Sequence, residues 1–380
     1  QKLYVEENQW VMDAYTDDNN KLYTWPIYGV NREVNHGFLY RKDIFEQLGI
    51  ELWNNTEEFY QVLKDLKTAY PDSYPYASKM KEYIFRDWGY GWGITGTYYP
   101  AFYDEADRTW KFQFTDPRHK EMLDFMKKLY NEGLLDPEFL TDTESSWTAK
   151  MTVGNSAFVT FDWIGRLDMF YEQVMEEYPD YDLRYGNPVG PTNNIQSTSK
   201  IMNWSHTVTN NENAETALKL LDYLTSPSGA ELITLGIRGK TYIEDSSGNI
   251  TYNEFSENEE VSIKKLEDKY GLWIEGMYLR ADERSIYFDY SEKEQEAQDM
   301  MKESREPLDP ILKFTDEENI IIANLQQNLL EAATEFSAKY ILIPSYGESE
   351  WIEWKGNAKS LGEKEYIQAY NHAQERLNEQ

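Results

Sequence analysis

The aromatic content of the chain is the feature that most limits what it can fold into. Its 380 residues carry a formal net charge of −31, and Leu, Ile, Val and Phe make up only about a fifth of them, which is close to the composition of disordered chains. The chain also holds 12 Trp, 30 Tyr and 16 Phe. Each of these rings can bury a large apolar area, and Tyr and Trp carry a polar group as well. The sequence therefore predicts a folded protein with an aromatic core and with rings to spare for a binding surface.

The charge balance and the residue counts exclude several kinds of function. Nucleic acids are bound by Lys and Arg side chains, and these number 37 against 68 Asp and Glu, so we expect no nucleic acid partner. The absence of Cys excludes disulfides, thiolate metal sites and a Cys nucleophile within these residues. No two of the four His have the helical spacing of a metal site, and no phosphate-binding loop or nucleophile-elbow motif occurs. We therefore expect no metal, no cofactor and no catalytic activity, and we expect a monomer.

Helix and strand signals alternate along the chain. Asp116-Pro117 combines a capping residue with a first-turn proline, and Thr315 forms a capping box with Glu318, so each pair predicts the start of a helix. Short strands interleaved with longer helices are typical of the α/β class. The length suits two domains, and because no Pro/Gly/Ser linker divides the chain, we expect two lobes joined by several crossings. The predicted strands are residues 21–25, 37–40 and 156–161, with a hairpin formed by 241–243 and 250–252.

Many aromatic residues lie where predicted strands and helices end, and not on helical stripes. Loops at strand ends build the ligand sites of α/β proteins. The C–H faces of a sugar stack on aromatic rings, while its hydroxyls bond to carboxylate, amide and guanidinium groups. For a single ring, core packing is the commoner role, but the set as a whole favours a sugar-binding groove. The set consists of Trp25, Tyr28, Trp88, Trp92, Trp163, Trp204, Trp273 and Tyr278, with Tyr98 and Tyr99.

Six segments of the chain, in the same order, resemble a known family. Leu129-Tyr-Asn-Glu-Gly-Leu-Leu-Asp-Pro-Glu138 is similar to the "LY.EGLIDPE" segment of the family 1 extracellular solute-binding proteins of ABC importers, in particular the large Gram-positive LipO-like lipoproteins. Each motif alone is modest, but six in the right order are specific, and they cover essentially the whole chain. The other five begin at Gly37, Thr56, Gly154, Asn213 and Gly236. In the last of these, Arg238 stands where the family usually has Glu.

The resemblance implies an α/β, two-lobed clamshell of the periplasmic-binding-protein type (type II) that closes on a solute. The solute is usually an oligosaccharide, which the protein delivers to the transmembrane subunits of an ABC permease. In the family, about a hundred residues precede the segment that resembles 21–26, including a signal peptide, a lipid-anchoring Cys and opening strands. We therefore expect a fragment of an extracellular, cell-surface lipoprotein. The expected lobes are an incomplete N-terminal one, residues 1–28 with about 203–245, and a C-terminal one, about 29–202 with 246–380.

The resemblance also implies ligand contacts at particular positions. The two crossings between the lobes face the cleft in the family, and an aromatic residue at the position of Trp163 commonly stacks on sugar. Trp88 and Trp92 have no such support, and their prediction rests on composition alone. The predicted ligand-binding residues are Trp25, Tyr28, Asn35, Trp88, Trp92, Trp163, Asn203, Trp204 and Arg280.

Two other functions stay open at this point. The abundant carboxylates could supply the pair that a secreted glycoside hydrolase needs, but a sequence does not show their separation. A binding protein for a non-sugar solute such as a peptide would also use aromatic loops. Asp104 and Asp245 begin segments that resemble pieces of calcium loops, but neither has the alternating ligands and the closing Glu of such a loop. We interpret both segments as hairpin turns.

Overall fold

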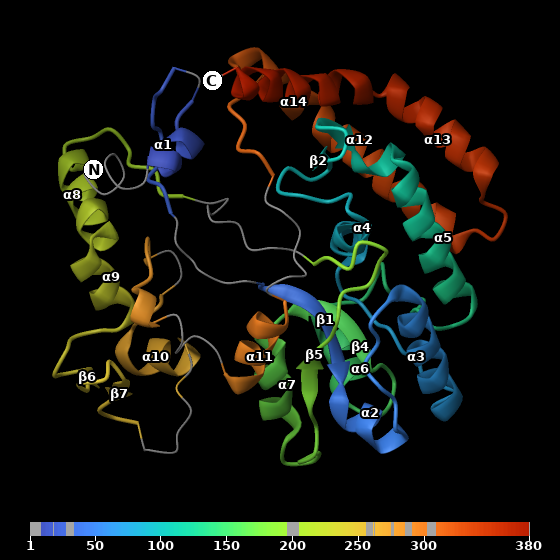
Figure 1. The fold of residues 1–380 in the computed structure, drawn as a ribbon, viewed down its shortest axis with the longest axis horizontal. Helices are drawn as coiled ribbons and strands as arrows, with labels where there is room; N and C mark the ends of the chain where they lie inside the picture. Colours follow the sequence, from blue (N-terminus) through green and yellow to red (C-terminus); the bar gives the residue numbers. More distant parts are fainter. Residues whose placement is uncertain are drawn as a thin grey trace. The chain divides into compact units, whose positions relative to one another are not determined.

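The chain folds into two compact units. The computed structural model describes residues 9–17, 19–27, 34–195, 205–255, 261, 263–274, 277–285, 291–301 and 309–379. Unit 1 consists of residues 1–32 and 198–295, and unit 2 of residues 33–197 and 296–380. The chain therefore passes between the units at residues 32–33, 197–198 and 295–296. Figure 1 shows the elements of both units.

Unit 1 combines helices with one β-hairpin. Two of its helices follow one another directly, because Ser226 ends the first and caps the second with its Oγ, which accepts the N–H of Gly229 at 3.2 Å. Helix α11 continues across the boundary into unit 2. The described elements of unit 1 are α1 (Gln9–Tyr15), α8 (Ala214–Thr225), α9 (Pro227–Thr234), β6 (Tyr242–Glu244), β7 (Ile250–Tyr252) and α10 (Ile263–Tyr270), with α11 at Glu292–Met300.

Residues 246–295 lie in unit 1. This corrects the prediction from the sequence, which placed them in the other lobe. The predicted boundary after residue 245 would cut the hairpin, in which β6 pairs antiparallel with β7. A single hydrophobic core then joins Tyr242 and Tyr252 of this hairpin to Leu266 and Trp273. The hairpin itself is confirmed, and Asp245 opens its turn by accepting the N–H groups of Ser247 and Asn249.

Unit 2 contains a three-stranded antiparallel sheet with β1 in the middle. β1 (His36–Arg41) lies between β4 (Val159–Trp163) and β5 (Leu183–Tyr185), as Figure 1 shows. The register pairs His36 with Trp163 and Leu39 with Tyr185. The start of β1 therefore lies beside the end of β4. A separate hairpin joins β2 (Ala101–Asp104) to β3 (Thr109–Phe112), which confirms the turn predicted at Asp104.

Helices surround this sheet and the β2–β3 hairpin. The predicted helix starts are confirmed, since Asp116 caps α5 and Thr315 forms a capping box with Glu318 in α12. The strand predicted at 21–25 is wrong, because Leu22 and Trp25 form only isolated bridges, with Thr16 and His206. Helix α12 packs on α5 and α14. The helices of unit 2 are α2 (Lys42–Leu48), α3 (Thr56–Ala69), α4 (Ile84–Gly89), α5 (Pro117–Asn131), α6 (Glu144–Thr152), α7 (Arg166–Val174), α12 (Asp316–Leu342), α13 (Glu348–Ser360) and α14 (Glu363–Asn378).

The core of unit 2 on one face of β1 is built from aromatic rings. Phe38 of β1 is 1% exposed, and its ring centroid lies 5.7 Å from those of Phe59 and Trp88 and 6.2 Å from that of Tyr76. Trp53 meets Phe59 edge to face at 4.9 Å. Edge-to-face rings contribute about 1 kcal/mol per pair beyond the area that they bury. This cluster fixes β1 against α3 and α4, and so it fixes where β1 begins.

Two backbone segments of unit 2 approach each other at glycines. A Cβ added to Gly91 would lie 1.7 Å from the carbonyl oxygen of Val189, and one added to Gly190 would lie 2.2 Å from the carbonyl oxygen of Gly91. Gly190 also has a φ of +132°, which residues with a Cβ rarely adopt. A backbone segment cannot move aside in the way that the end of a flexible side chain can. Any side chain at Gly91 must therefore push the two segments apart.

We expect Gly91→Ala to lower the free energy of unfolding by about 3 kcal/mol, the cost of forcing extra volume into a packed site. Gly356 is the matched control, since it is exposed within α13 and an added Cβ would meet nothing within 4 Å. Gly356→Ala should raise the free energy of unfolding by up to about 1 kcal/mol through helix propensity. Chemical denaturation measures both, and equal stability of the two variants would contradict the close approach.

Candidate functional site

The start of β1 and the end of β4 bring two of the predicted ligand-binding residues together. Trp163 is half-buried and lies opposite His36 in the strand register. Asn35, also half-buried, accepts the N–H of Ile164 through its carbonyl oxygen at 3.0 Å. We call Asn35, His36, Asp162 and Trp163 the β1–β4 corner. It contains a partly exposed indole ring and a side-chain amide, whose Asn35 Nδ2 lies 3.4 Å from His36 Nδ1. These are the kinds of group expected to stack on and bond to a sugar.

Two cations bind the carboxylate of Asp162 beside this corner. Lys79 Nζ lies 3.1 Å from Asp162 Oδ2, and Arg166 Nε lies 3.2 Å from the same oxygen. Both cations also form ion pairs with Glu144 at the start of α6. Lys79 Nζ lies 2.5 Å from Glu144 Oε2. The Asp162 side chain is 5% exposed, whereas that of Glu144 is 55% exposed. The four groups form a compact ion-pair network with one exposed carboxylate.

The Trp147 ring lies beneath this network. Lys79 Nζ is 4.7 Å from the ring centroid and Arg166 Cζ is 5.4 Å from it, so both cations face the ring. The indole N–H of Trp147 donates to Thr160 Oγ1 of β4 at 2.9 Å. Trp147 is fully buried. The ring therefore positions both cations from inside the unit.

Burial is the main reason that His36 is neutral. Burial lowers the pKa of His36 to about 4. The negative charge of Asp162 acts to raise this pKa, and the cations Arg86, Lys79 and Arg166 act to lower it. At neutral pH the imidazole is uncharged. The corner thus combines neutral polar groups with an ion-pair network.

A second ion pair, between half-buried Arg86 and buried Asp87, lies close to these charges. Arg86 donates to Asp87 Oδ1 from Nε at 3.0 Å and from Nη2 at 2.8 Å. Burial raises the pKa of Asp87 to about 6, against the lowering effect of Arg86. The other oxygen of Asp87 is buried and has no hydrogen-bond partner among the described residues. At 1% exposure, Asp87 is enclosed by the unit and does not reach its surface.

Gly165 determines where the Trp163 ring lies. Gly165 precedes α7, and a Cβ added to it would lie 2.4 Å from Cη2 of the Trp163 ring. The ring therefore folds over the backbone at Gly165. A methyl group there would move the outer end of a side chain and not a backbone segment.

Trp88 and Trp92 are not binding residues in this structure, and their prediction from composition is wrong. Trp88 is 0% exposed and its indole N–H donates to Tyr76 Oη at 2.9 Å. Trp92 is 3% exposed and stacks on Trp88 with a centroid distance of 6.2 Å. The loop that the glycines suggested is the short helix α4 with a following 3₁₀ turn at Tyr90–Trp92. Both rings belong to the core and offer no free face to a ligand.

The remaining predicted residues belong to unit 1 or lie outside the described residues. Trp25 packs on Ile27 and Leu221, and its indole N–H donates to Thr225 Oγ1 at 2.8 Å. Arg280 is half-buried, and its Nη1 is buried with no hydrogen-bond partner among the described residues. Their contact with a ligand stays a prediction. The positions outside the described residues are Tyr28, Asn203 and Trp204.

The sequence did not point to His36, Lys79, Asp162 or Glu144. His36 follows Asn35 in the chain and Asp162 precedes Trp163. This adjacency to predicted residues was the only local signal that could have identified them. Lys79 and Glu144 come from other segments and join the corner only through the fold.

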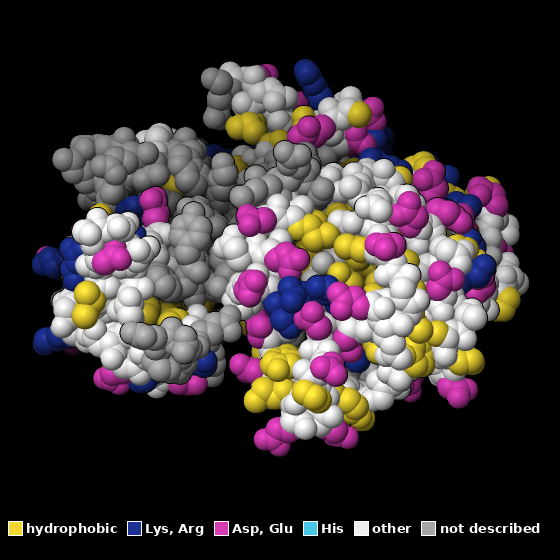
Figure 2. All heavy atoms as spheres, turned by 60° about the horizontal axis from the view of Figure 1, so that its bottom comes forward, with side chains coloured by type: hydrophobic (Ala, Val, Ile, Leu, Met, Phe, Trp, Pro, Cys, Tyr) yellow, Lys and Arg dark blue, Asp and Glu magenta, His cyan; other side chains and the backbone are white. Residues whose placement is uncertain are grey.

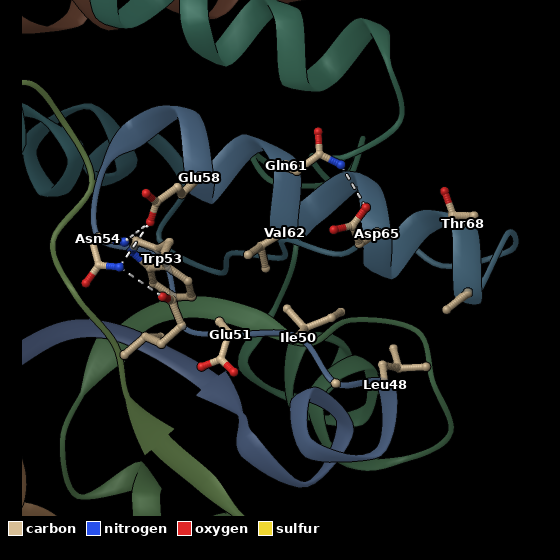
Figure 3. A pocket seen from close by; sticks show the side chains of 13 residues that line it. Leu48, Ile50, Glu51, Trp53, Asn54, Glu58, Gln61, Val62, Asp65 and Thr68 are labelled. Atoms are coloured by element: carbon tan, nitrogen blue, oxygen red, sulfur yellow. Dashed lines mark hydrogen bonds between the residues drawn. The ribbon is translucent and has the colours of Figure 1, made fainter.

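A groove of unit 2 lies elsewhere, between α3 and residues 48–54. It has a volume of about 720 Å³ and contains none of the predicted residues. Figure 3 shows Glu58, Gln61 and Asp65 along α3 above Ile50 and Glu51. The polar groups bond to one another, with Glu58 accepting the N–H of Asn54 at 2.8 Å and Asp65 accepting from Gln61 at 2.7 Å.

Among the described residues, one group of carboxylates is compact enough to hold a metal ion, but an ammonium group is already bound to it. Asp136, Glu138 and Asp142 present oxygens within 4.8 Å of one another. Lys150 Nζ lies 2.7 Å from Asp136, 2.7 Å from Glu138 and 2.8 Å from Asp142. Burial alone would lower the pKa of Lys150, but the hydrogen bonds to these carboxylates raise it above its ordinary value. We call these four side chains the lysine cage.

Solved structures of solute-binding proteins share this fold. The structure of the alginate-binding protein AlgQ2 without calcium ion has a TM-score of 0.73 at 19% identity, over 98% of this chain and 78% of that one. A solute-binding protein of Bifidobacterium longum infantis, described as HMO-binding and ABC-transporter associated, has a TM-score of 0.72 at 16% identity, over 98% and 80%. FusA of S. pneumoniae in complex with kestose has a TM-score of 0.67 at 16% identity, over 99% and 80%. The predicted fold class, that of the α/β, two-lobed solute-binding proteins, is confirmed.

The sequence identifies the family within this class. The family model described as bacterial extracellular solute-binding protein matches residues 3–231. The chain belongs to this family. Lipoprotein LipO of Bacillus subtilis (strain 168) is 22% identical over 234 residues, which are 57% of this chain and 46% of that protein. The resemblance seen in the motifs is therefore confirmed, and the chain spans about half the length of this curated relative. Among the described residues, none of the helices has the length and hydropathy that crossing a bilayer requires.

Lys150→Met should lower the free energy of unfolding by about 3 kcal/mol, because it leaves carboxylates buried without their counter-ion. Millimolar calcium chloride should restore part of this loss in the variant and leave the wild type unchanged, since only the variant has an open place for a cation. Thermal melts with and without calcium measure both effects. Lys364→Met, at an exposed position on α14, is the control. A variant as stable as the wild type would contradict the role of Lys150.

His36 should make the protein less stable as the pH falls from about 6.5 to about 4. Its pKa is about 4 in the folded protein, against 6.5 for a solvated imidazole, so the unfolded chain binds the proton more readily and acid favours unfolding. The difference between these two pKa values corresponds to a loss of about 3 kcal/mol in the free energy of unfolding. Denaturation at pH 7 and pH 4.5 should show that His36→Gln loses less stability than the wild type. His372→Gln, an exposed position on α14, should behave like the wild type. An unchanged pH dependence in His36→Gln would contradict the prediction.

Proposed function

We propose that this protein is the extracellular solute-binding component of an ABC transporter and captures an oligosaccharide between its two lobes. The β1–β4 corner is the observation that carries the proposal. It carries Trp163, a half-buried ring, and Asn35, which has a side-chain amide, on neighbouring segments of a sheet that packs on an aromatic core. A rigid ring loses little conformational freedom when a sugar stacks on it, so its contact area converts efficiently into affinity.

The relatives support this choice of ligand. The descriptions of the similar structures name alginate, HMO, kestose and Man5GlcNAc as ligands, and all four are glycans. The family membership and the likeness to a lipoprotein support a place at the cell surface, and they support delivery of the sugar to a permease. Closure of the lobes would need ligand contacts that exist only in the closed form, because a ligand shifts an equilibrium only by its difference in affinity.

A glycoside hydrolase is the less favoured alternative. Such an enzyme needs a carboxylic acid with a raised pKa within reach of the sugar. Glu144 is the exposed carboxylate of the corner network. Burial acts to raise its pKa, but Lys79 and Arg166 outweigh burial and hold the pKa below its ordinary value. Burial raises the pKa of Asp87 and of Asp309 to about 6, but Asp87 is 1% exposed, and Asp309 accepts the backbone N–H of Thr97 at 2.5 Å. Incubation of the protein with a bound sugar discriminates, since a hydrolase would release shorter products and a binding protein would leave the sugar intact.

Calorimetry with a broad panel of neutral and acidic oligosaccharides, and with short peptides, tests the proposal. We expect one class of oligosaccharide to bind and to raise the melting temperature. Trp163→Ala should weaken this binding at least tenfold, equivalent to about 1.4 kcal/mol, while Tyr178→Ala, at an exposed ring after α7, should leave it unchanged. If only peptides bind, or if no sugar binds, the proposal fails.

Gly165→Ala provides an independent check on the position of the ring. The added methyl group should displace the outer end of Trp163 and weaken sugar binding, with the melting temperature nearly unchanged. Full affinity in Gly165→Ala together with a loss in Trp163→Ala would show that the ring binds in another orientation.

A further inference from the structure

We propose that the groove between α3 and residues 48–54 binds a helical segment of a partner protein, one that carries two Lys or Arg side chains seven residues apart with apolar residues between them. We call this groove the α3 groove. It contains none of the residues predicted to bind a sugar, so the inference does not depend on the proposed function.

The floor of the α3 groove is apolar. Leu48, Ile50 and Leu52 are half-buried along one wall, and Val62 of α3 is 6% exposed. In Figure 3, Val62 faces Ile50 and Leu48 across the groove. A partner that covers these aliphatic side chains gains about 25 cal/mol for each Å² of apolar area removed from water. The floor therefore favours a protein segment with apolar side chains over a small ion.

Three carboxylates line the same groove without a cation. Glu51, Glu58 and Asp65 are exposed, and none of them forms an ion pair with a described Lys or Arg. Glu58 accepts hydrogen bonds from the backbone and the side chain of Asn54. Asp65 accepts one from Gln61. These donors are neutral amides, so the negative charge of the groove is not balanced by them.

The two lysines of α3 lie against aromatic rings outside the groove. Lys64 Nζ is 5.3 Å from the centroid of the Tyr60 ring, and Lys67 Nζ is 4.8 Å from that of the Tyr74 ring. Lys67 Nζ also donates to the carbonyl oxygen of Ser73 at 2.6 Å. Neither lysine lines the groove. The charge of the three carboxylates is therefore left for a partner to balance.

The spacing of the lining residues fits a helix. The lining positions of α3 run from Glu58 to Ala69, and an α-helix rises about 1.5 Å per residue, so α3 forms about 16 Å of the groove. Glu58 and Asp65 are seven residues apart, which is two turns or about 10 Å. A second helix packed along α3 presents its residues i, i+3, i+4 and i+7 on one face. Cations at i and i+7 then reach the two carboxylates, while apolar residues at i+3 and i+4 cover the floor.

An extended peptide suits the α3 groove less well. Such a peptide binds by adding a strand, and this requires free backbone groups along an edge. The N–H groups of Gly49, Ile50 and Asn54 already donate within unit 2. A helix bonds its own backbone internally and needs only the side chains of the groove.

Both walls of the groove are held by contacts inside unit 2. Trp53 is 0% exposed, and its indole N–H donates to the carbonyl oxygen of Asn187 at 2.9 Å. The Trp53 ring meets Phe59 of α3 edge to face at 4.9 Å. Asn55 caps α3 by accepting the N–H of Glu58 at 2.9 Å. A preformed groove orders few of its own groups when a partner binds, so little affinity is lost to that ordering.

The overall charge also favours a cationic partner. The chain carries a formal net charge of −31, and Figure 2 shows Asp and Glu side chains spread over the displayed face, with Lys and Arg side chains among them. A strongly negative protein attracts a cationic segment at long range, and salt weakens this attraction. This attraction acts on any cationic peptide, whereas the match in spacing acts only at the groove.

A helical peptide of about 16 residues tests the inference. The probe has two Lys seven residues apart and Leu at the third and fourth positions after the first Lys, on a background of Ala and Gln. The control peptide has the same composition, with both Lys moved to the face opposite the Leu residues. Calorimetry should show that the probe binds at least tenfold more tightly than the control. Equal affinity of the two peptides, or no binding of the probe, would overturn the inference and leave the proposed function intact.

Two double variants with the same change in charge test where the probe binds. Glu58→Gln with Asp65→Asn removes two carboxylates of the α3 groove and should weaken binding of the probe at least fivefold. Glu353→Gln with Glu375→Gln removes two carboxylates from exposed positions on α13 and α14 and should leave the affinity unchanged. Equal weakening by the two double variants would assign the binding to overall charge and overturn the role of the groove. The melting temperature of each variant verifies that it is folded.

Discussion

Phe38 touches the rings of Trp53, Phe59, Tyr76 and Trp88, which come from four separate segments of unit 2. Through these ring contacts β1 packs against α3 and α4. Because β1 is the central strand of its sheet, β4 and β5 take their positions from it. The corner at the start of β1 is therefore an edge of the aromatic core. A partly exposed ring such as Trp163 stays in place because buried rings hold the strand beside it.

The buried carboxylates of unit 2 are neutralised by cations that lie next to them. The sequence has far more carboxylates than cations, yet the carboxylates that are buried in unit 2 have close cationic partners, as Asp87, Asp136, Asp142 and Asp162 show. The surplus lies on the surface, where water solvates it. This division explains how a chain with such a composition forms a dense core, because the net charge is not carried by the groups that the core encloses.

The sequence predicted those features that depend on neighbouring residues. The caps at Asp116 and Thr315, the hairpin turn at Asp245 and the family motifs are all local patterns, and the structure confirms them. Trp163 and Asn35 were recognised from motifs as well, and the register of β1 and β4 brings them together. The contact of either residue with a ligand is still a prediction.

The errors have a different physical origin. Trp88 and Trp92 lie among glycines, which suggested an exposed loop, but the glycines serve close packing, since Gly91 touches the backbone at Val189. The segment 21–25 has the composition of a strand but finds only isolated bridges. Residues 246–295 were assigned to the other lobe because no local pattern shows which core a helix joins. Each of these errors concerns contacts between residues that are distant in the sequence.

The lysine cage has a consequence for the conditions under which this protein can work. A bound metal ion stabilises a fold only in proportion to its concentration outside, so dilution or a chelator removes the stabilisation. In the cage, the positive charge belongs to the side chain of Lys150, which the backbone holds beside Asp136, Glu138 and Asp142. The segment from Leu134 to Glu138 therefore keeps its shape whatever the supply of divalent ions in the surroundings. An internal cation makes this part of the fold independent of the divalent ions around it.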